Sequence, residues 1–270
     1  MAVVLLSEKA ERLSSTIAEM ESVLVAFSGG ADSALVAAVA ARTVGDRALA
    51  VTAVSASLPP GELETARATA RTIGIEHRTV RTHEVQMEAY QANGLDRCYH
   101  CKTELYDVLG DLARQEGFAH VVSGANADDL GDFRPGLRAA AERAIRHPLV
   151  EAGLGKDDVR ELSRELGLPT WDKPASACLS SRFAFGVRIG VEELSKVGRA
   201  ERAIKELGFR QVRVRVHDDV ARVEVEPQDI TRLVEHRNAV TIALKDLGYR
   251  FVTIDLEGFR SGSMNPPDGT

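Results

Sequence analysis

The segment that most constrains this chain runs from Val23 to Ala40. Val23–Phe27 is an unbroken apolar run, which is typical of a strand buried on both faces in a parallel sheet. Ser28-Gly29-Gly30-Ala31-Asp32-Ser33 follows, and an alanine-rich stretch that favours a helix comes next. A strand that turns through glycines into a helix presents backbone N–H groups at the positive end of that helix. This arrangement is suited to binding an anion.

We expect this loop to bind phosphate groups. Gly29 and Gly30 allow the backbone to approach a phosphate closely, and Ser28 and Ser33 can add hydroxyl donors. Asp32 would repel a phosphate unless a cation lies between them, so we assign it to Mg²⁺. No lysine follows the glycines, which excludes a Walker-type loop. The alternative is a tight turn that only caps a helix.

Composition and charge argue against a nucleic-acid-binding, a secreted or a membrane-spanning protein. The chain has 270 residues, of which 44% are hydrophobic, and this is enough for one large domain or two modest ones. Its net charge of −6 argues against a nucleic-acid partner. The apolar residues 1–6 are too few for a secretion signal, and no apolar run is long enough to span a membrane. We expect a cytoplasmic protein with no membrane association.

Strand and helix patterns alternate through the first two thirds of the chain. This alternation predicts an α/β fold with a doubly wound parallel sheet, in which ligands bind beyond the carboxyl ends of the strands. Ser28 and Gly124 both follow such ends, so we expect their loops to share one crevice. The expected strands are 23–27, 48–54, 77–81 and 119–123, and the expected helices are 7–21, 32–44, 62–73 and 102–116.

The pattern changes after about residue 190. Residues 211–216 and 220–226 alternate strictly between apolar and polar, which predicts a hairpin of half-buried antiparallel strands. Expected helices at 191–207 and 227–246 and a strand at 251–256 complete a smaller α+β domain. We therefore predict two domains, 1–188 and 189–270.

A second polar loop follows the fourth expected strand. It begins at Gly124, whose lack of a side chain permits close packing on a nucleotide. Asn126 can position a polar group, Asp128 can serve a metal or a hydrogen-bond donor, and Arg134 can clamp an anion. The alternative is a polar loop that caps the next helix.

Three cysteines form the second chemical feature. Cys98 and Cys101 have the spacing of metal ligands, and Cys178 lies between Lys173 and Arg182, which should favour its thiolate. Three thiolates can hold an iron–sulfur cluster with one iron left open, and with a histidine they could hold zinc. The same spacing also fits a redox pair of thiols, and inert buried cysteines would need no ligand at all.

Arg213 and Arg215 lie on one face of the expected hairpin strand, together with His217. Such a face suits the phosphate of a mononucleotide. The alternative is cross-strand pairing with acids such as Glu224 and Glu226.

The SGGADS loop resembles the PP-loop of the ATP pyrophosphatase superfamily. Together with CYHCK, GANADD, DFRPG and WDKPASACLSSR, it makes most of the chain similar to the sulfur transferases that build the nickel-pincer cofactor of lactate racemase. The resemblance implies that ATP adenylates a carboxylate of a pyridinium dicarboxylate mononucleotide. Sulfur then displaces AMP and leaves a thiocarboxylate. It also implies a homo-oligomer and catalytic roles for Asp32, Cys178 and Arg182.

The family has two branches, which differ in their sulfur source. In one, a single cysteine at the position of Cys178 is sacrificed; in the other, three cysteines bind a [4Fe–4S] cluster that carries an extra sulfide. All three thiols are present here, so the chain resembles the second branch, with Cys98, Cys101 and Cys178 as ligands. By the same resemblance, Glu201 could support the site or contact a metal, but we expect it to be a solvated helix residue. The competing hypotheses are a sacrificial Cys178, a tRNA-thiolating PP-loop enzyme, and a non-catalytic nucleotide or iron–sulfur sensor.

Overall fold

The structure is a computed structural model that describes residues 2–131, 135–174, 176–260 and 264. It divides into two compact units. The first consists of Met1–Ser55, Gly61–Glu84 and Asp96–Ser176, and the second of Ala56–Pro60, Val85–Leu95 and Ala177–Thr270. The second unit thus takes in residues 177–188 and two short earlier segments, which the expected division after residue 188 assigned to the first domain. That two-domain division itself stays a prediction.

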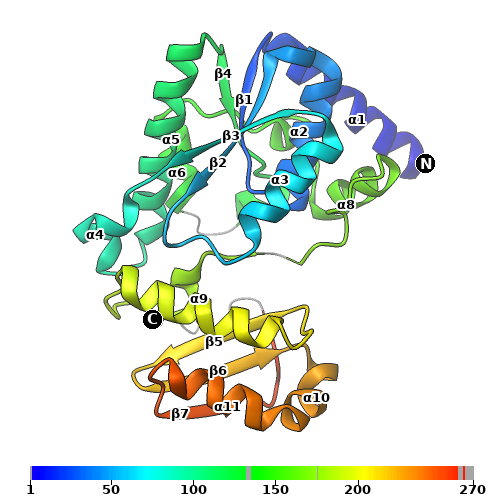
Figure 1. Cartoon of the computed structure of the whole chain (residues 1–270). Helices are drawn as coiled ribbons and strands as arrows, with labels where there is room; N and C mark the ends of the chain where they lie inside the picture. The colour runs from blue at the N-terminus through cyan, green and yellow to red at the C-terminus, as the bar shows by residue number, and fades with distance from the viewer. Residues whose placement is uncertain (1, 132–134, 175, 261–263, 265–270) are drawn as a thin grey trace. The chain divides into compact units, whose positions relative to one another are not determined.

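A parallel sheet forms the centre of the first unit (Figure 1). Its strands lie in the order β3-β2-β1-β4, and Leu24 of β1 lies opposite Leu49 of β2 and Val121 of β4. The expected α/β fold class is confirmed. The strands are β1 (Val23–Ala26), β2 (Ala48–Val54), β3 (Glu76–Arg81) and β4 (His120–Val122).

Helices cover both faces of this sheet because alternate strand residues point to opposite sides. Val23 and Val25 of β1 pack with the helices of one face, and Leu24 packs with those of the other. The first face carries α1 (Ala2–Glu19), α2 (Ala31–Val44), α3 (Glu62–Ile73), α7 (Pro148–Glu151) and α8 (Lys156–Glu165). The second carries α5 (Arg97–Glu116) and α6 (Pro135–Glu142).

Helix α5 begins at Arg97, five residues before the start expected from the sequence. Cys98 and Cys101 therefore lie within the first five residues of a helix rather than in a loop before it. Short elements complete the first unit: the 3₁₀ helices η1 (Gly45–Arg47), η2 (Glu84–Gln86, shared with the second unit) and η3 (Ala127–Gly131).

The second unit is built on a three-stranded sheet of order β5-β6-β7. β5 (Val212–His217) and β6 (Val220–Val225) form the expected hairpin, and Asp218, with a φ of +53°, makes the turn. β7 (Phe251–Ile254) pairs with β6 in parallel. Helix α9 (Val191–Lys205) buries Leu194, Val197 and Ile204. The unit also contains α4 (Glu88–Gln91), η4 (Leu179–Arg182) and η5 (Pro227–Asp229).

One expected helix is interrupted. Residues 227–246 form η5, α10 (Ile230–Glu235) and α11 (Arg237–Asp246) instead of a single helix. The break lies at His236, whose backbone leaves the helical region and whose ring Nδ1 is 2.9 Å from the carbonyl of Arg232. A side chain that binds a nearby backbone group competes with the helix in this way. Among the described helices, none is both long and apolar enough to cross a membrane.

Candidate active site

The loop after β1 is held in a compact turn by its own serines. The Ser28 and Ser33 hydroxyl oxygens are 3.0 Å apart, and the backbone N–H of Ser28 donates to Ser33 Oγ at 3.2 Å. Gly30 N–H donates to Ser28 Oγ at 3.3 Å. Gly29 has a φ of +69°, and a Cβ there would lie 2.7 Å from the Cα of Ala66 on α3. Only glycine fits this position, since both its conformation and its space exclude a side chain.

Lys173 braces the same loop from a distant part of the chain. Its amine donates to the Gly29 carbonyl at 3.0 Å and to Glu62 on α3 at 2.9 Å. The sequence suggested that Lys173 favours the Cys178 thiolate, and this stays a prediction. The contact between Lys173 and Gly29 joins residues that are far apart in the sequence, so the residues around Lys173 could not predict it.

The loop after β4 packs directly on the loop after β1. A Cβ on Gly124 would lie 2.7 Å from the backbone nitrogen of Ser33, so the absence of a side chain permits this contact. The Asn126 amide donates to Asp32 Oδ1 at 2.9 Å, and Asn126 is buried. The structure therefore brings Asp32, Asn126 and Gly124 together, as the parallel sheet predicts.

Asp32 lies in a buried and negatively charged setting. Burial raises the pKa of its carboxyl above the usual range; the Asn126 hydrogen bond opposes this, and the nearby Asp129 carboxylate adds to it. Lys156 lowers the pKa of Asp32 by a smaller effect. Two carboxylates close together in a buried site repel each other, and a hard divalent cation such as Mg²⁺ would relieve that repulsion. The donor set at Asp32 thus fits the expected metal.

Asp128 contacts the start of a helix and the Asn126 side chain. Asp128 Oδ2 accepts the backbone N–H of Lys156 at 2.7 Å, so this carboxylate caps α8. Its own N–H donates to Asn126 Oδ1 at 3.1 Å, which helps to orient the Asn126 amide toward Asp32. Arg134 lies outside the described residues.

The three cysteines come from both units. Cys98 is exposed and Cys101 half-buried, one turn apart on α5 in the first unit. Cys178 is half-buried in the second unit, and none of the three forms a disulfide. Within the described residues, no group of three or more His, Cys, Asp or Glu side chains is arranged to hold a metal ion.

Arg182 and Glu201 form a buried ion pair beside Cys178. Arg182 Nε and Nη2 donate to the two Glu201 carboxylate oxygens at 2.8 and 3.0 Å. Arg182 Nη1 donates to the carbonyls of Ala177 and Cys178 at 2.8 and 3.0 Å. Glu201 is 1% exposed, so the expectation of a solvated residue is wrong. Its partner is remote in sequence, and the helical pattern could not reveal it.

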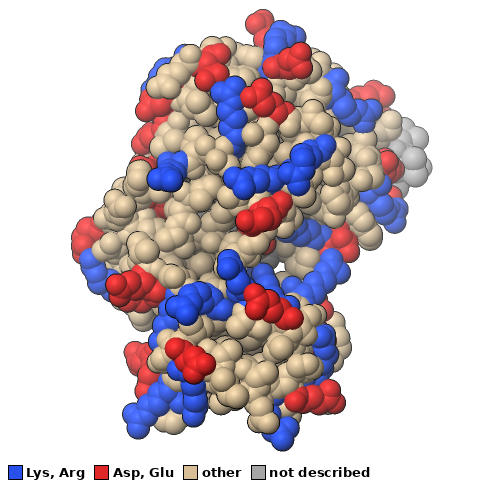
Figure 2. Space-filling model, in the orientation of Figure 1, with Lys and Arg blue, Asp and Glu red and all other residues tan. Residues whose placement is uncertain are grey.

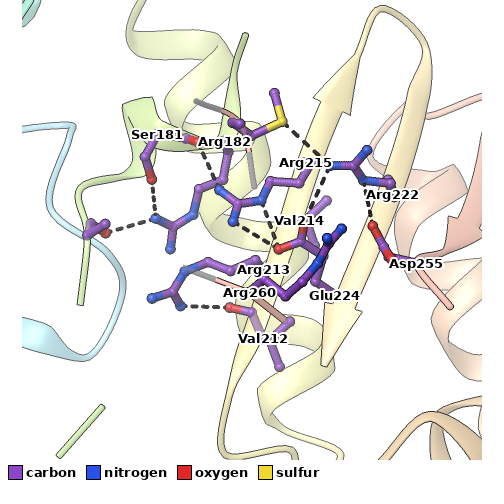
Figure 3. A network of polar contacts seen from close by, with 12 residues as sticks. Ser181, Arg182, Val212, Arg213, Val214, Arg215, Arg222, Glu224, Asp255 and Arg260 are labelled. Carbon is purple, nitrogen blue, oxygen red and sulfur yellow. Dashed lines mark hydrogen bonds and ion pairs between the residues drawn. The ribbon is translucent and has the colours of Figure 1, made fainter. Parts of the chain in front are cut away.

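Arg213 and Arg215 are buried on β5 (Figure 3). Arg215 donates to Glu224 Oε2 at 2.9 Å and to the Ser181 carbonyl at 2.9 Å, so the expected possibility of cross-strand pairing holds for this residue. Arg213 lies opposite Glu224 in the strand register, donates to the Val212 carbonyl, and places its guanidinium 5.2 Å from the centre of the Phe259 ring.

Two acids, Glu224 and Asp255, contact this group of arginines. Glu224 also accepts from Arg222 at 3.3 Å, and Arg222 pairs with Asp255 at 3.5 Å. Arg215 and Arg222 thus share the Glu224 carboxylate, and Arg222 also pairs with Asp255 (Figure 3). Guanidinium groups gathered on one sheet face are donors that suit an anion such as phosphate. Figure 2 shows the charged residues on one face of the molecule.

Comparisons with known proteins agree with this geometry. Residues 13–156 match the asparagine synthase family, which covers more than half of the chain and includes both loops. The pyridinium-3,5-bisthiocarboxylic acid mononucleotide synthase of Lactiplantibacillus plantarum is 38% identical over 261 residues, which is 96% of this chain and 95% of that protein. The chain belongs to the PP-loop sulfur transferase family of nickel-pincer cofactor biosynthesis. The resemblance inferred from the sequence is thereby confirmed, and so is the enzyme class of ATP-dependent sulfur transferase.

Two further proteins are similar over most of their length. An uncharacterized protein of Synechocystis is 48% identical over 97% of this chain and 98% of its own length. An uncharacterized protein of Methanocaldococcus jannaschii is 28% identical over 89% of this chain and 92% of its own. The similarity therefore spans both units and extends well beyond the PP-loop.

Proposed function

We propose that this enzyme uses ATP to adenylate a carboxylate of a pyridinium dicarboxylate mononucleotide and then exchanges AMP for sulfur. A carboxylate oxygen attacks the α-phosphorus of ATP, and pyrophosphate leaves. A sulfur nucleophile then attacks the acyl carbon, AMP leaves, and a thiocarboxylate remains. The name of the Lactiplantibacillus relative supports this substrate class. The observation that carries the proposal is the Asn126–Asp32 contact, which joins the two loops beyond the strand ends.

The residues of the first unit serve the adenylation. Ser28, Gly29, Gly30 and Ser33 supply hydroxyl and backbone N–H donors to the ATP phosphates, and a helix N-terminus adds its positive end. Asp32 holds Mg²⁺ and Asn126 orients Asp32. These groups stabilise the negative charge that develops on the leaving pyrophosphate. Arg134 is proposed as an additional phosphate ligand.

The residues of the second unit serve the acceptor and the sulfur. Arg213 and Arg215 are proposed to hold the phosphate of the mononucleotide, because their guanidinium groups gather on β5 and a guanidinium can donate two hydrogen bonds to a phosphate. Arg182 holds the backbone around Cys178 and thereby sets the direction of its thiol.

Cys98, Cys101 and Cys178 are the proposed ligands of a [4Fe–4S] cluster. Thiolates are the ligands that such clusters take, no disulfide occupies the three cysteines, and Cys98 and Cys101 lie three residues apart on α5. When bound, the cluster would supply the sulfur that replaces AMP. The alternative source is Cys178 itself, which would lose its sulfur and become dehydroalanine.

The test combines three measurements on anaerobically purified protein. Pyrophosphate release on adding ATP, Mg²⁺ and the mononucleotide is expected, and its absence would contradict the proposal and favour a non-catalytic sensor. Bound iron and sulfide with an unchanged protein mass after turnover would support the cluster. Loss of about one H₂S from the protein would instead identify Cys178 as the donor. The cytoplasmic location and the homo-oligomeric state remain predictions. Size-exclusion chromatography tests the oligomeric state.

A further inference from the structure

A hydrogen-bonded path lies beneath the phosphate-binding loop. The Thr52 hydroxyl on β2 donates to the Phe27 carbonyl at 2.7 Å, and His77 Nε2 on β3 lies 2.8 Å from the same hydroxyl oxygen. Thr52 and Phe27 are 3% and 2% exposed, so water does not compete for these groups. Phe27 directly precedes Ser28, and the path therefore ends at the first residue of the loop.

The direction of the path follows from the single proton of the hydroxyl. Thr52 uses that proton on the Phe27 carbonyl, so its oxygen accepts from His77. His77 Nε2 must therefore carry a proton. Burial and the nearby Arg67 on α3 lower the pKa of His77, which favours the neutral ring. The hydrogen bond to Thr52 then places the single ring proton on Nε2.

His77 also contacts Phe27 directly. The two rings meet edge to face with their centres 5.8 Å apart. The His77 imidazole thus contacts the Phe27 ring directly and holds the Phe27 carbonyl through Thr52. On its other side the loop packs on α3 through Gly29 and Ala66.

We propose that His77 is a positioning residue for the phosphate-binding loop and acts through Thr52. This inference rests on the proposed binding of ATP at that loop. With the path intact, the Phe27 carbonyl and hence the backbone of Ser28 keep one orientation. Without it, the loop must be ordered when ATP binds, and binding weakens.

Calorimetric titration of the full chain with ATP and Mg²⁺ tests this proposal. Thr52→Val and His77→Leu are each expected to raise the Kd for ATP about three- to tenfold, the effect of one buried hydrogen bond. The double variant is expected to bind no more weakly than the weaker single variant, because both changes break the same path. Thr52→Ser keeps the hydroxyl and is expected to restore binding to within about twofold of wild type.

The matched control is Thr79→Val, which makes the same substitution at an exposed position of β3. Wild-type affinity in Thr52→Val and His77→Leu, or additive losses in the double variant, would overturn the proposal. If Thr52→Val does not fold, His77→Leu decides alone, since His77 is only half-buried. Failure of the wild-type protein to bind ATP would refute the proposed function itself, which separates the two outcomes.

Discussion

The guanidinium of Arg182 and the carboxylate of Glu201 meet at two points, 2.8 and 3.0 Å apart, with both side chains fully enclosed by protein. Glu201 also accepts the backbone N–H of Val214 at 3.0 Å, which ties α9 to β5. Arg182 Nη1 donates to the carbonyls of Ala177 and Cys178, which lie on either side of the Cys178 Cα. One ion pair thus connects a helix, a strand and the segment that carries a proposed reactive thiol.

Glu201→Gln should lower the free energy of unfolding by about 3–5 kcal/mol, because it leaves the Arg182 charge buried without a counter-ion. Urea denaturation measures this loss. Glu88→Gln is the matched control, since Glu88 pairs with Arg188 at the surface, and we expect little change there. Equal losses in the two variants would contradict our account of the pair.

Asn126→Ala should slow pyrophosphate release about tenfold or more, because it removes a hydrogen bond to the buried Asp32 carboxylate. A coupled pyrophosphate assay at saturating mononucleotide measures the rate. Asn238→Ala, at an exposed position of α11, is the control. An unchanged rate in Asn126→Ala would show that orientation of Asp32 does not limit adenylation.

Gly29→Ala should destabilise the protein and abolish ATP binding, since the new methyl group would collide with Ala66 as well as occupy a left-handed conformation. Gly74→Ala separates the two causes. Gly74 has a φ of +78° with open space around it, so only the conformational cost of about 1–2 kcal/mol applies. Thermal unfolding and ATP titration compare them, and full ATP binding by Gly29→Ala would refute the packing argument.

Cys98→Ala and Cys101→Ala should each abolish iron retention and sulfur transfer and spare pyrophosphate release. The reason is that, in the proposed mechanism, adenylation uses the loop after β1 and not the thiols. Iron analysis after anaerobic purification, together with the pyrophosphate assay, checks both statements. Full sulfur transfer by either variant would reject the cluster assignment.

His147 should make the protein less stable as the pH falls. Burial lowers the pKa of His147 below its usual value near 6.5, and its Nδ1 lies 2.7 Å from Ser123 Oγ. The unfolded chain therefore gains a proton more readily, so this contribution is present above about pH 6.5 and is lost as the pH falls below it.

His147→Gln removes that titration, and its unfolding free energy should fall less than that of wild type between about pH 7 and 5. Urea denaturation across this range measures the difference, and the exposed His83→Gln controls for the loss of a histidine. Parallel pH curves for wild type and His147→Gln would contradict the prediction.

The elements that local patterns specify were predictable. Alternation of apolar strands with amphipathic helices indicated the parallel sheet, and Gly29 and Asp32 marked the phosphate loop, because these signals lie within a few consecutive residues. The start of α5 was wrong by five residues, since Arg97 and Cys98 have no apolar periodicity that would extend the helix pattern.

The amino-acid sequence by itself determined the fold class, the family and the identity of the loops that meet beyond the sheet. Only the tertiary structure decided that Glu201 is buried against Arg182, that Lys173 braces Gly29, and that Arg215 pairs with Glu224. Each of these choices joins a charged side chain to a partner that is not its neighbour in sequence. A buried charge without a partner costs free energy, so each of these side chains needs one. Which acid or carbonyl is within reach depends on how the whole chain packs.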